Sequence, residues 1–220
     1  MKNHRYPRLF YSVLLLLLAL ASPQCGDPEQ TTAAGGTTQA SLDADGDGKI
    51  DGVPDGVADW FTVQELVTLA NAGLPIYTGE NPPAIDGVYL ADTLRIVFDS
   101  LGASGDLAVY RFTFADQQSD GSLVLSYESE GVDSSAGNPA WIAGEGDCFS
   151  VFTNIEGYQE EDDCTYQRPT VYSACLNGEG DLTGFFFGFI MKGLSGDCSA
   201  TMPEGGYRVI GENDGLVARQ

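Results

Sequence analysis

The spacing of hydrophobic and polar residues divides this 220-residue chain into three zones. Residues 9–21 form one continuous apolar run, residues 62–72 repeat apolar side chains with a helical period, and from about residue 85 apolar and polar positions alternate. Alternation is typical of half-buried strands, whereas spacings of three and four residues are typical of an amphipathic helix. The pattern therefore predicts a mainly β protein preceded by one short helix.

The helix is predicted over residues 62–72. Thr62 and Glu65 have the Thr-x-x-Glu spacing of a capping box, in which each side chain accepts a hydrogen bond from the backbone N–H of the other residue. Gly73 and Pro75 end the helical pattern. The apolar face of the helix would carry Val63, Leu66, Val67 and Ala70.

The alternating region contains about eight candidate strands, separated by turns rich in Gly, Asp, Asn and Ser. No amphipathic helix pattern interrupts them, and Asp120-Gly121 has the composition of a tight hairpin turn. Such a series of short strands predicts a closed antiparallel barrel or a sandwich. The candidate strands are residues 94–99, 109–114, 123–127, 139–144, 148–156, 166–176, 182–192 and 206–211.

The strand predicted at 182–192 indicates what fills the β domain. Its alternation places four large apolar side chains on one face, namely Phe185, Phe187, Phe189 and Met191. A barrel of eight strands is just wide enough to be filled by side chains or to hold one small ligand. We expect these residues to be core, with a ligand-lined cavity as the alternative.

The apolar run at 9–21 follows three basic residues and is shorter than the ~20 residues that a membrane-spanning helix needs. This arrangement is typical of a secretory signal peptide, here residues 1–24. The small, polar and unpatterned residues that follow predict a flexible tether over residues 25–42.

Cys25, at the end of the signal peptide, resembles the lipid-carrying cysteine of bacterial lipoproteins. It is the odd one of five cysteines and lies far from the other four, and an odd cysteine in an exported protein needs a role of its own. The resemblance implies a protein anchored to the bacterial cell envelope, at the outer membrane, by lipid on Cys25. The alternative is cleavage after Ala21, which would give a secreted protein with a free thiol.

Composition narrows the classes of function. The single histidine, His4, lies inside the predicted signal peptide, so the exported chain would lack the histidine of Ser-His-Asp and Cys-His catalysis and of histidine-ligated zinc. The chain has 32 acidic and 10 basic residues and a net charge of −22. Because such a chain repels phosphates, nucleic acid is not expected as a partner, and a divalent cation is.

Residues 43–59 hold the clearest chemical pattern, a series of aspartates on a glycine-broken segment. Calcium takes six to eight oxygen ligands, and a loop supplies them with carboxylates at alternate positions and a glycine at the turn. Asp43, Asp45 and Asp47, followed by Gly48, give this alternation. The segment resembles the start of an EF-hand loop, and its later aspartates, at intervals of four, resemble thrombospondin type 3 repeats.

The resemblance implies a calcium site with Ile50 as an apolar plug behind it. Pro54 stands where an EF-hand has its bidentate glutamate. Calcium would stiffen the passage from tether to domain, and the alternative is a solvated acidic linker that binds no ion. The implied oxygen ligands are Asp43, Asp45, Asp47, the Lys49 carbonyl, Asp51 and Asp55.

A further resemblance concerns the β domain, residues 80–220, which follows a helix and connector at 60–79. The segment Gly87-Val88-Tyr89 is similar to the Gly-x-Trp opening of lipocalin-like (calycin) barrels, with tyrosine in place of tryptophan. Arg208 lies on the last candidate strand, where that family often keeps an arginine. The resemblance implies an eight-stranded up-and-down barrel with a cavity for a small apolar ligand.

Four cysteines lie in the β domain, and an oxidising envelope would pair them. If their flanking strands form a hairpin, Cys148 lies opposite Cys175, and Cys164 meets Cys198 at the other end. We therefore predict these two disulfides. The acidic loop at 160–163 lacks any alternation with glycine, and we expect a solvated tip there rather than a second calcium site.

Three functions follow from these expectations. The first is a non-enzymatic, calcium-binding, lipid-anchored envelope protein, whose barrel binds an unknown small ligand or an envelope protein partner. The second is a hydrolase that acts on envelope or extracellular glycans with carboxylates alone. The third is a purely structural envelope protein with a solid barrel. A cavity inside the barrel would separate the first function from the third.

Overall fold

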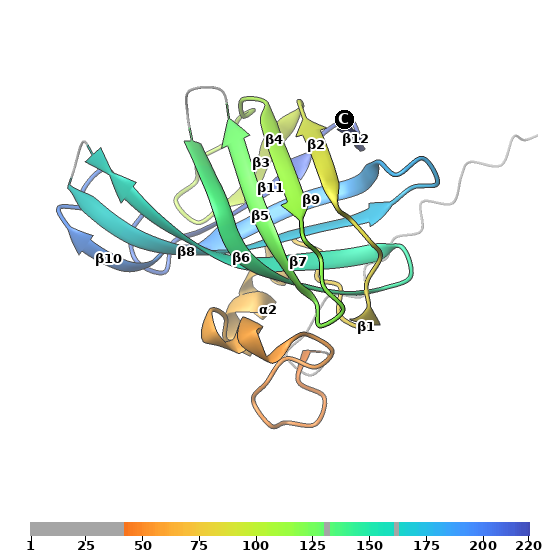
Figure 1. Ribbon diagram of the computed structural model, residues 1–220. Coiled ribbons are helices and arrows are strands. Elements are labelled where there is room, and N and C mark those ends of the chain that lie inside the picture. The colour runs from red at the N-terminus through yellow and green to blue at the C-terminus, as the bar shows by residue number, and fades with distance from the viewer. Residues whose placement is uncertain (1–41, 130–132, 161–162) are drawn as a thin grey trace, which may run out of the picture. The chain divides into compact units, whose positions relative to one another are not determined.

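Antiparallel pairing of β8 with β9 closes the strands of this protein into a barrel. A computed structural model describes residues 42–129, 133–160 and 163–220. Going round the barrel, the strands follow the order β2, β4, β5, β6, β7, β8, β9 and β12, and β12 pairs with β2 again (Figure 1). The predicted closed antiparallel barrel of eight strands is therefore confirmed.

Consecutive strands of the barrel are neighbours in space, as in an up-and-down barrel. The short strands β3 and β11 pair with each other, and this pairing continues the pairing of β2 with β12. The strands are β1 Glu80–Asn81, β2 Gly87–Ala91, β3 Leu94–Asp99, β4 Tyr110–Ala115, β5 Ser122–Ser129, β6 Asp133–Glu145, β7 Cys148–Gln159, β8 Cys164–Leu176, β9 Leu182–Ile190, β10 Lys192–Gly196, β11 Tyr207–Glu212 and β12 Leu216–Arg219.

The C-terminal strands differ from the prediction. The expected strand at 182–192 is divided at Met191 into β9 and β10, and β10 continues the antiparallel pairing with β8 toward the start of that strand. The pattern also missed β12, whose four residues close the circuit against β2. The family resemblance placed Arg208 on the last strand. Arg208 lies on β11, and β12 follows it. It is Arg219, on β12, that lies opposite Tyr89.

The strands bury side chains on both faces of the barrel wall. Inside the barrel, Phe185 and Phe187 of β9 belong to a core of aromatic and aliphatic residues contributed by every strand of the circuit. On the outside, Phe186 and Ile190 of the same strand pack against a second core. The prediction that the odd-numbered phenylalanines are core is confirmed. On the outer face of β9, Gly188 and Ile190 are buried and Phe186 is half-buried against the second core.

The second core holds the helix and the aspartate-rich loop against the outer wall. Helix α2, Val63–Asn71, lies outside the barrel against β9 and β11 (Figure 1). Its buried face is Val63, Leu66, Val67 and Leu69, so that Leu69 takes the place expected for Ala70. Gly188 permits this close packing, because a Cβ atom at this position would lie 3.2 Å from the Leu74 side chain.

The start of α2 has the predicted capping box. The Thr62 hydroxyl accepts a hydrogen bond from the Glu65 N–H at 3.3 Å, and the Glu65 carboxylate accepts one from the Thr62 N–H at 2.8 Å. A short 3₁₀ helix, η1 Asp55–Asp59, precedes it and buries Val57 in the same core. The local sequence signal and the tertiary packing therefore agree on where the helix begins.

Both predicted disulfides are present. Cys148 and Cys175 are direct partners in the β7–β8 register and are bonded to each other. The second bond joins Cys164, at the start of β8, to Cys198, after β10. The two disulfides therefore fix β8 at both of its ends.

A partly buried ion pair joins α2 to the barrel. Lys192 Nζ donates hydrogen bonds to the Glu65 carboxylate and to the Trp60 carbonyl, each at 2.8 Å. Burial works against ionisation of Glu65, but the hydrogen bonds from Lys192 and Thr62 and the positive charge of Lys192 outweigh it and lower the pKa. A carboxyl with a depressed folded-state pKa stabilises the fold fully above its ordinary pKa. This stabilisation is lost as the pH falls through the lower, folded value.

We expect Lys192→Met to reduce the free energy of unfolding by about 2 kcal/mol at pH 7, because it leaves the Glu65 carboxylate partly buried without its charged donor. The variant should also lose less stability than the parent protein on acidification. Urea denaturation at pH 7 and at pH 4 measures both effects.

Arg111→Met is the matched control, because Arg111 and Glu128 form an ion pair at 2.8 Å whose side chains are 51% and 63% exposed. Exposed pairs contribute about 0–1 kcal/mol. If the two variants lose equal stability, Lys192 does not hold the helix to the barrel.

Candidate functional site

The aspartate-rich loop is closed at its base by backbone and side-chain hydrogen bonds. The Asp51 N–H donates to the Leu42 carbonyl at 2.8 Å, and the Ala44 N–H donates to Asp51 Oδ2 at 2.7 Å. Gly48, with φ of +82°, turns the chain inside this closure. The sequence therefore builds a compact loop in which successive aspartates lie on a tight turn.

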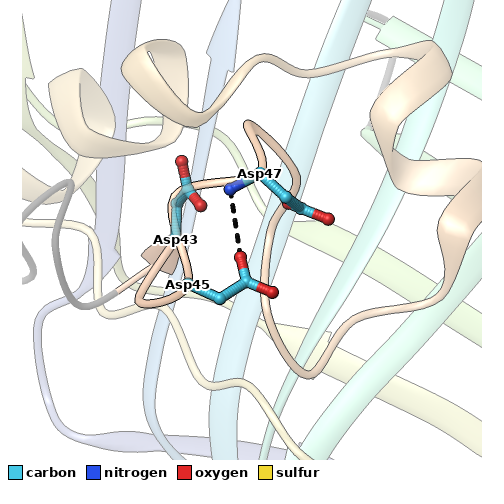
Figure 2. A group of neighbouring side chains, drawn as sticks. All are labelled: Asp43, Asp45 and Asp47. Atoms are coloured by element: carbon cyan, nitrogen blue, oxygen red, sulfur yellow. Dashed lines mark hydrogen bonds between the residues drawn. The ribbon is translucent and has the colours of Figure 1, made fainter.

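Three of the predicted ligands come together in this loop. One carboxylate oxygen from each of Asp43, Asp45 and Asp47 lies within 4.8 Å of the other two. Figure 2 draws the three side chains on the loop. The Asp47 N–H donates to Asp45 Oδ1 at 3.1 Å, and the Gly48 N–H donates to Asp43 Oδ2 at 3.2 Å. Backbone donors thus hold the Asp43 and Asp45 carboxylates in place, and a third backbone N–H, from Lys49, does the same for Asp47.

One oxygen of this group lacks a partner. Asp43 Oδ1 is buried and accepts no hydrogen bond from any described residue. A buried carboxylate oxygen is costly unless a donor or a cation compensates it. Three carboxylates this close also repel one another, so the donor set fits a hard, oxygen-seeking divalent cation.

The remaining predicted ligands lie outside the group of three. Asp51 uses Oδ2 to accept the Ala44 N–H, and Asp55 lies 3.7 Å from the Lys49 ammonium with its side chain 95% exposed. The Lys49 N–H donates to Asp47 Oδ1 at 2.8 Å, which orients that carboxylate. Lys49, Asp51 and Asp55 therefore remain predicted ligands.

The loop is fixed to the protein by packing and not only by its own hydrogen bonds. Leu42 and Ile50 are buried in the second core, which lies outside the barrel and is called the outer core below. Phe61 and, from the barrel wall, Phe152 belong to the same core. Ile50, the residue predicted as an apolar plug, is buried. The shape of the loop thus depends on the same core that holds the helix.

A second acidic group was missed by sequence reasoning. Asp92, Glu212 and Asp214 bring one carboxylate oxygen each within 4.8 Å of the others. Glu212 Oε1 accepts hydrogen bonds from the Thr93 hydroxyl and from the Asn213 N–H. No local motif marks this group, because the β3–β11 pairing brings together two turns that are far apart in the sequence.

A cavity of about 230 Å³ opens inside the barrel, at the end opposite the aspartate-rich loop. The cavity lies where β5 ends and where β4 and β6 begin. The start of β5 is at the other end of the barrel, where Gly121 comes close to Pro54 of the aspartate-rich segment. Its wall combines an aromatic and aliphatic lining with a few polar groups. The lining residues are Leu107, Tyr110, Phe112, Tyr127, Asp133, Arg168, Thr170, Tyr172, Phe187, Phe189, Arg208 and Ile210.

Two arginines dominate the charge of this lining. Arg168 Nη2 donates to Asp133 Oδ2 at 2.9 Å and to the Tyr127 hydroxyl, while Arg168 Nε is buried and has no partner among the described residues. Arg208 Nε donates to Asp99 at 2.6 Å. Both guanidinium groups also lie over the Phe189 ring. The distance from Cζ to the ring centre is 5.3 Å for Arg168 and 6.0 Å for Arg208.

The cavity tyrosines remain protonated at neutral pH. Burial raises the pKa of Tyr110, Tyr127 and Tyr172, and for Tyr127 and Tyr172 it outweighs the opposing positive charge of Arg168. Their hydroxyls therefore serve as neutral hydrogen-bonding groups beside the arginines.

Sequence reasoning identified the phenylalanines of β9 but not the charged part of the cavity. The strand predicted at 166–176 did contain a signal for a buried charge, since alternation places Arg168 on the same face as Thr170 and Tyr172. A single charge on a face that is otherwise apolar or aromatic indicates a buried polar site. Asp133 carried no such signal, because its pairing with Arg168 is made across the barrel end.

The predicted signal peptide at 1–24, Cys25 and the tether as far as residue 41 lie outside the described residues, as do Glu161 and Asp162 of the acidic loop. Within the described ranges, no helix is both long and apolar enough to cross a membrane. Comparison of the chain with family models, with curated proteins and with solved structures finds no match. Function must therefore be argued from the loop and the cavity themselves.

We expect Gly48→Ala to destabilise the protein by about 1 kcal/mol, because a side chain at φ of +82° is strained even though space around this glycine is open. Thermal or urea unfolding measures the loss. Gly178→Ala is the control, since Gly178 also lies in open space and has no left-handed φ. Equal stabilities for the two variants would show that the turn at Gly48 is not needed for the fold.

Proposed function

We propose that this protein is a calcium-binding, lipid-anchored protein of the bacterial cell envelope whose barrel binds a small ligand. The cavity carries the proposal, because its aromatic wall and few convergent polar groups are typical of small-molecule sites. At about 230 Å³ it is smaller than the ~300–1,000 Å³ of sites for drug-sized molecules. The ligand is therefore compact.

The cavity favours this function over the two alternatives. A cavity beside buried charges is destabilising, and a structural protein would be expected to have a filled barrel instead. A carboxylate-only glycan hydrolase needs two carboxylates at the reacting bond. Among the described residues that line the cavity, Asp133 is the one carboxylate, and its hydrogen bond from Arg168 holds it as a counter-ion. We therefore propose a binding module and not an enzyme.

The loop supports the calcium part of the proposal. Asp43, Asp45 and Asp47 would hold the ion, with Lys49, Asp51 and Asp55 completing the oxygen ligands directly or through water. The unpartnered Asp43 Oδ1 is the observation that favours an ion over a solvated linker. Because the outer core already holds the loop, calcium would stiffen a preformed turn at the junction between tether and domain.

The disulfides support the compartment. Disulfides persist in oxidising environments such as the bacterial envelope, and the described chain has two. Together with the signal-like N-terminus and the Cys25 position, they favour an exported protein. We propose the outer membrane as its site, reached through lipid on Cys25, with secretion as the alternative.

A neutral aromatic probe, 1-naphthamide, tests the cavity. We expect saturable binding by isothermal titration calorimetry, and we expect Leu107→Trp to weaken it by at least about tenfold, because the larger side chain fills the space. Leu101→Trp makes the same change on a side chain that is 60% exposed, and it should leave binding unchanged. Equal affinities for both variants would place the probe outside the barrel.

Calcium titration of the full chain tests the loop. We expect binding with a Kd of about 10⁻⁴ to 10⁻³ M, which is typical of extracellular modules, and we expect Asp45→Asn/Asp47→Asn to abolish it. Asp92→Asn/Asp214→Asn removes the same charge from the second acidic group and should bind as the parent does. The reverse result would move the calcium site to Asp92 and Glu212, and no heat at millimolar calcium would make the loop a charged stalk.

A further inference from the structure

The charged groups of the cavity indicate the class of ligand, an argument that rests on the proposed binding function. The chain has 32 acidic residues against 10 basic ones, yet two arginines, Arg168 and Arg208, line this one cavity. The basic residues of the described chain that do not line it are Lys49, Arg95, Arg111, Lys192 and Arg219. In so acidic a protein, a concentration of guanidinium groups beside an apolar hollow favours an anion as the occupant.

The hydrogen-bonding capacity of the two arginines is only partly used. A guanidinium has five N–H donors in a fixed planar fork. Asp133 and Tyr127 take Nη2 of Arg168, and Asp99 takes Nε of Arg208. Arg168 Nε, which is buried, has no acceptor among the described residues. One buried donor of the site therefore lacks an acceptor within the described ranges.

Each arginine of the cavity has an acidic counter-ion, and the one that pairs with Arg208 is itself held in place. Asp99 is buried, and its Oδ1 accepts the backbone N–H groups of Leu101 and Ala103. It therefore serves as a fixed counter-ion behind Arg208 and is not one of the cavity-lining residues. Asp133, which lines the cavity, is the counter-ion of Arg168. The counter-ions allow two cations to lie close to the Phe189 ring while leaving donors for one more acceptor.

The rest of the lining specifies the remainder of the ligand. Phe112, Phe187 and Ile210 present apolar surface, and burial keeps the neighbouring tyrosine hydroxyls neutral. The volume of about 230 Å³ limits the apolar body to a small ring system or a short chain. One flat, singly charged acid group matches the planar fork better than a dianion, which Asp133 would repel.

We propose that the cavity binds a compact apolar monocarboxylate, whose carboxylate accepts hydrogen bonds from Arg168 and Arg208 and whose apolar body packs against Phe112, Phe187 and Ile210. The Tyr127 and Tyr110 hydroxyls border the carboxylate. The ligand fills the acceptor position that Arg168 Nε lacks in the described chain.

A matched pair of probes tests the proposal in the full chain. 1-Naphthoate and 1-naphthamide have the same ring system and differ in the charge of the head group. By isothermal titration calorimetry we expect naphthoate to bind at least about tenfold more tightly, because charged hydrogen bonds to arginine are the stronger ones. Arg208→Gln should lower the ratio of naphthoate affinity to naphthamide affinity, because it removes one of the two guanidinium groups that donate to the carboxylate.

Arg208 is the preferred position for substitution, since Asp99 keeps its two backbone donors without it, whereas replacing Arg168 would leave Asp133 unpaired. Arg111→Gln, on the exposed face of β4, removes one positive charge from outside the barrel and should change neither affinity. The melting temperature of each variant confirms that it is folded.

The outcomes separate the two proposals. Equal affinities of the parent protein for naphthoate and naphthamide would overturn the monocarboxylate and leave the binding module standing. Weaker naphthoate binding in Arg111→Gln equal to that in Arg208→Gln would also overturn it, since the preference would then come from net charge. Binding of neither probe at millimolar concentration would overturn both the ligand class and the binding module.

Discussion

The pairing of β8 with β9 is the constraint on which the rest of the structure depends. It closes the barrel, and it places β9 where both of its faces must be buried. Alternation along a strand sends successive side chains to opposite faces, so Phe187 points into the barrel and Phe186 points to the outer core. The interior face of β9 lines part of the cavity. Helix α2 and the aspartate-rich loop pack against the core on its exterior face. A change in the register of this one strand would therefore disturb both candidate sites.

The two candidate sites occupy opposite ends of the barrel and concentrate opposite charge. Three aspartates gather on the loop at one end, and two arginines with their counter-ions line the cavity at the other. Both arrangements leave a buried polar atom without a partner, Asp43 Oδ1 in the loop and Arg168 Nε in the cavity. Such atoms are few in folded proteins because they are costly. A cation and an anion, respectively, are the simplest compensations, which makes the chemistry of the two proposals complementary.

Much of the fold could be predicted from local patterns. The capping box at Thr62 and Glu65 and the alternation of β9 were readable in the sequence, because each depends on residues a few positions apart. The alternation left a barrel or a sandwich open, and the up-and-down order was implied by the resemblance to lipocalin-like barrels. Both disulfides followed from the hairpin geometry of β7 and β8. The prediction failed at β12, since its four residues carry little pattern and gain their structure from pairing with β2.

By itself, the sequence determined a helix followed by a series of antiparallel strands, and it predicted the pairing of the cysteines and a loop of alternating aspartates with a glycine at its turn. Those features depend on spacing along the chain, and spacing is visible in a sequence. Only the tertiary structure decided that Asp43, Asp45 and Asp47 converge while Asp55 turns to Lys49. It also decided that Arg168 meets Asp133, that Arg208 meets Asp99, and that both arginines face one cavity. These contacts join residues 35 and 109 positions apart, and closure of the barrel is what brings them together.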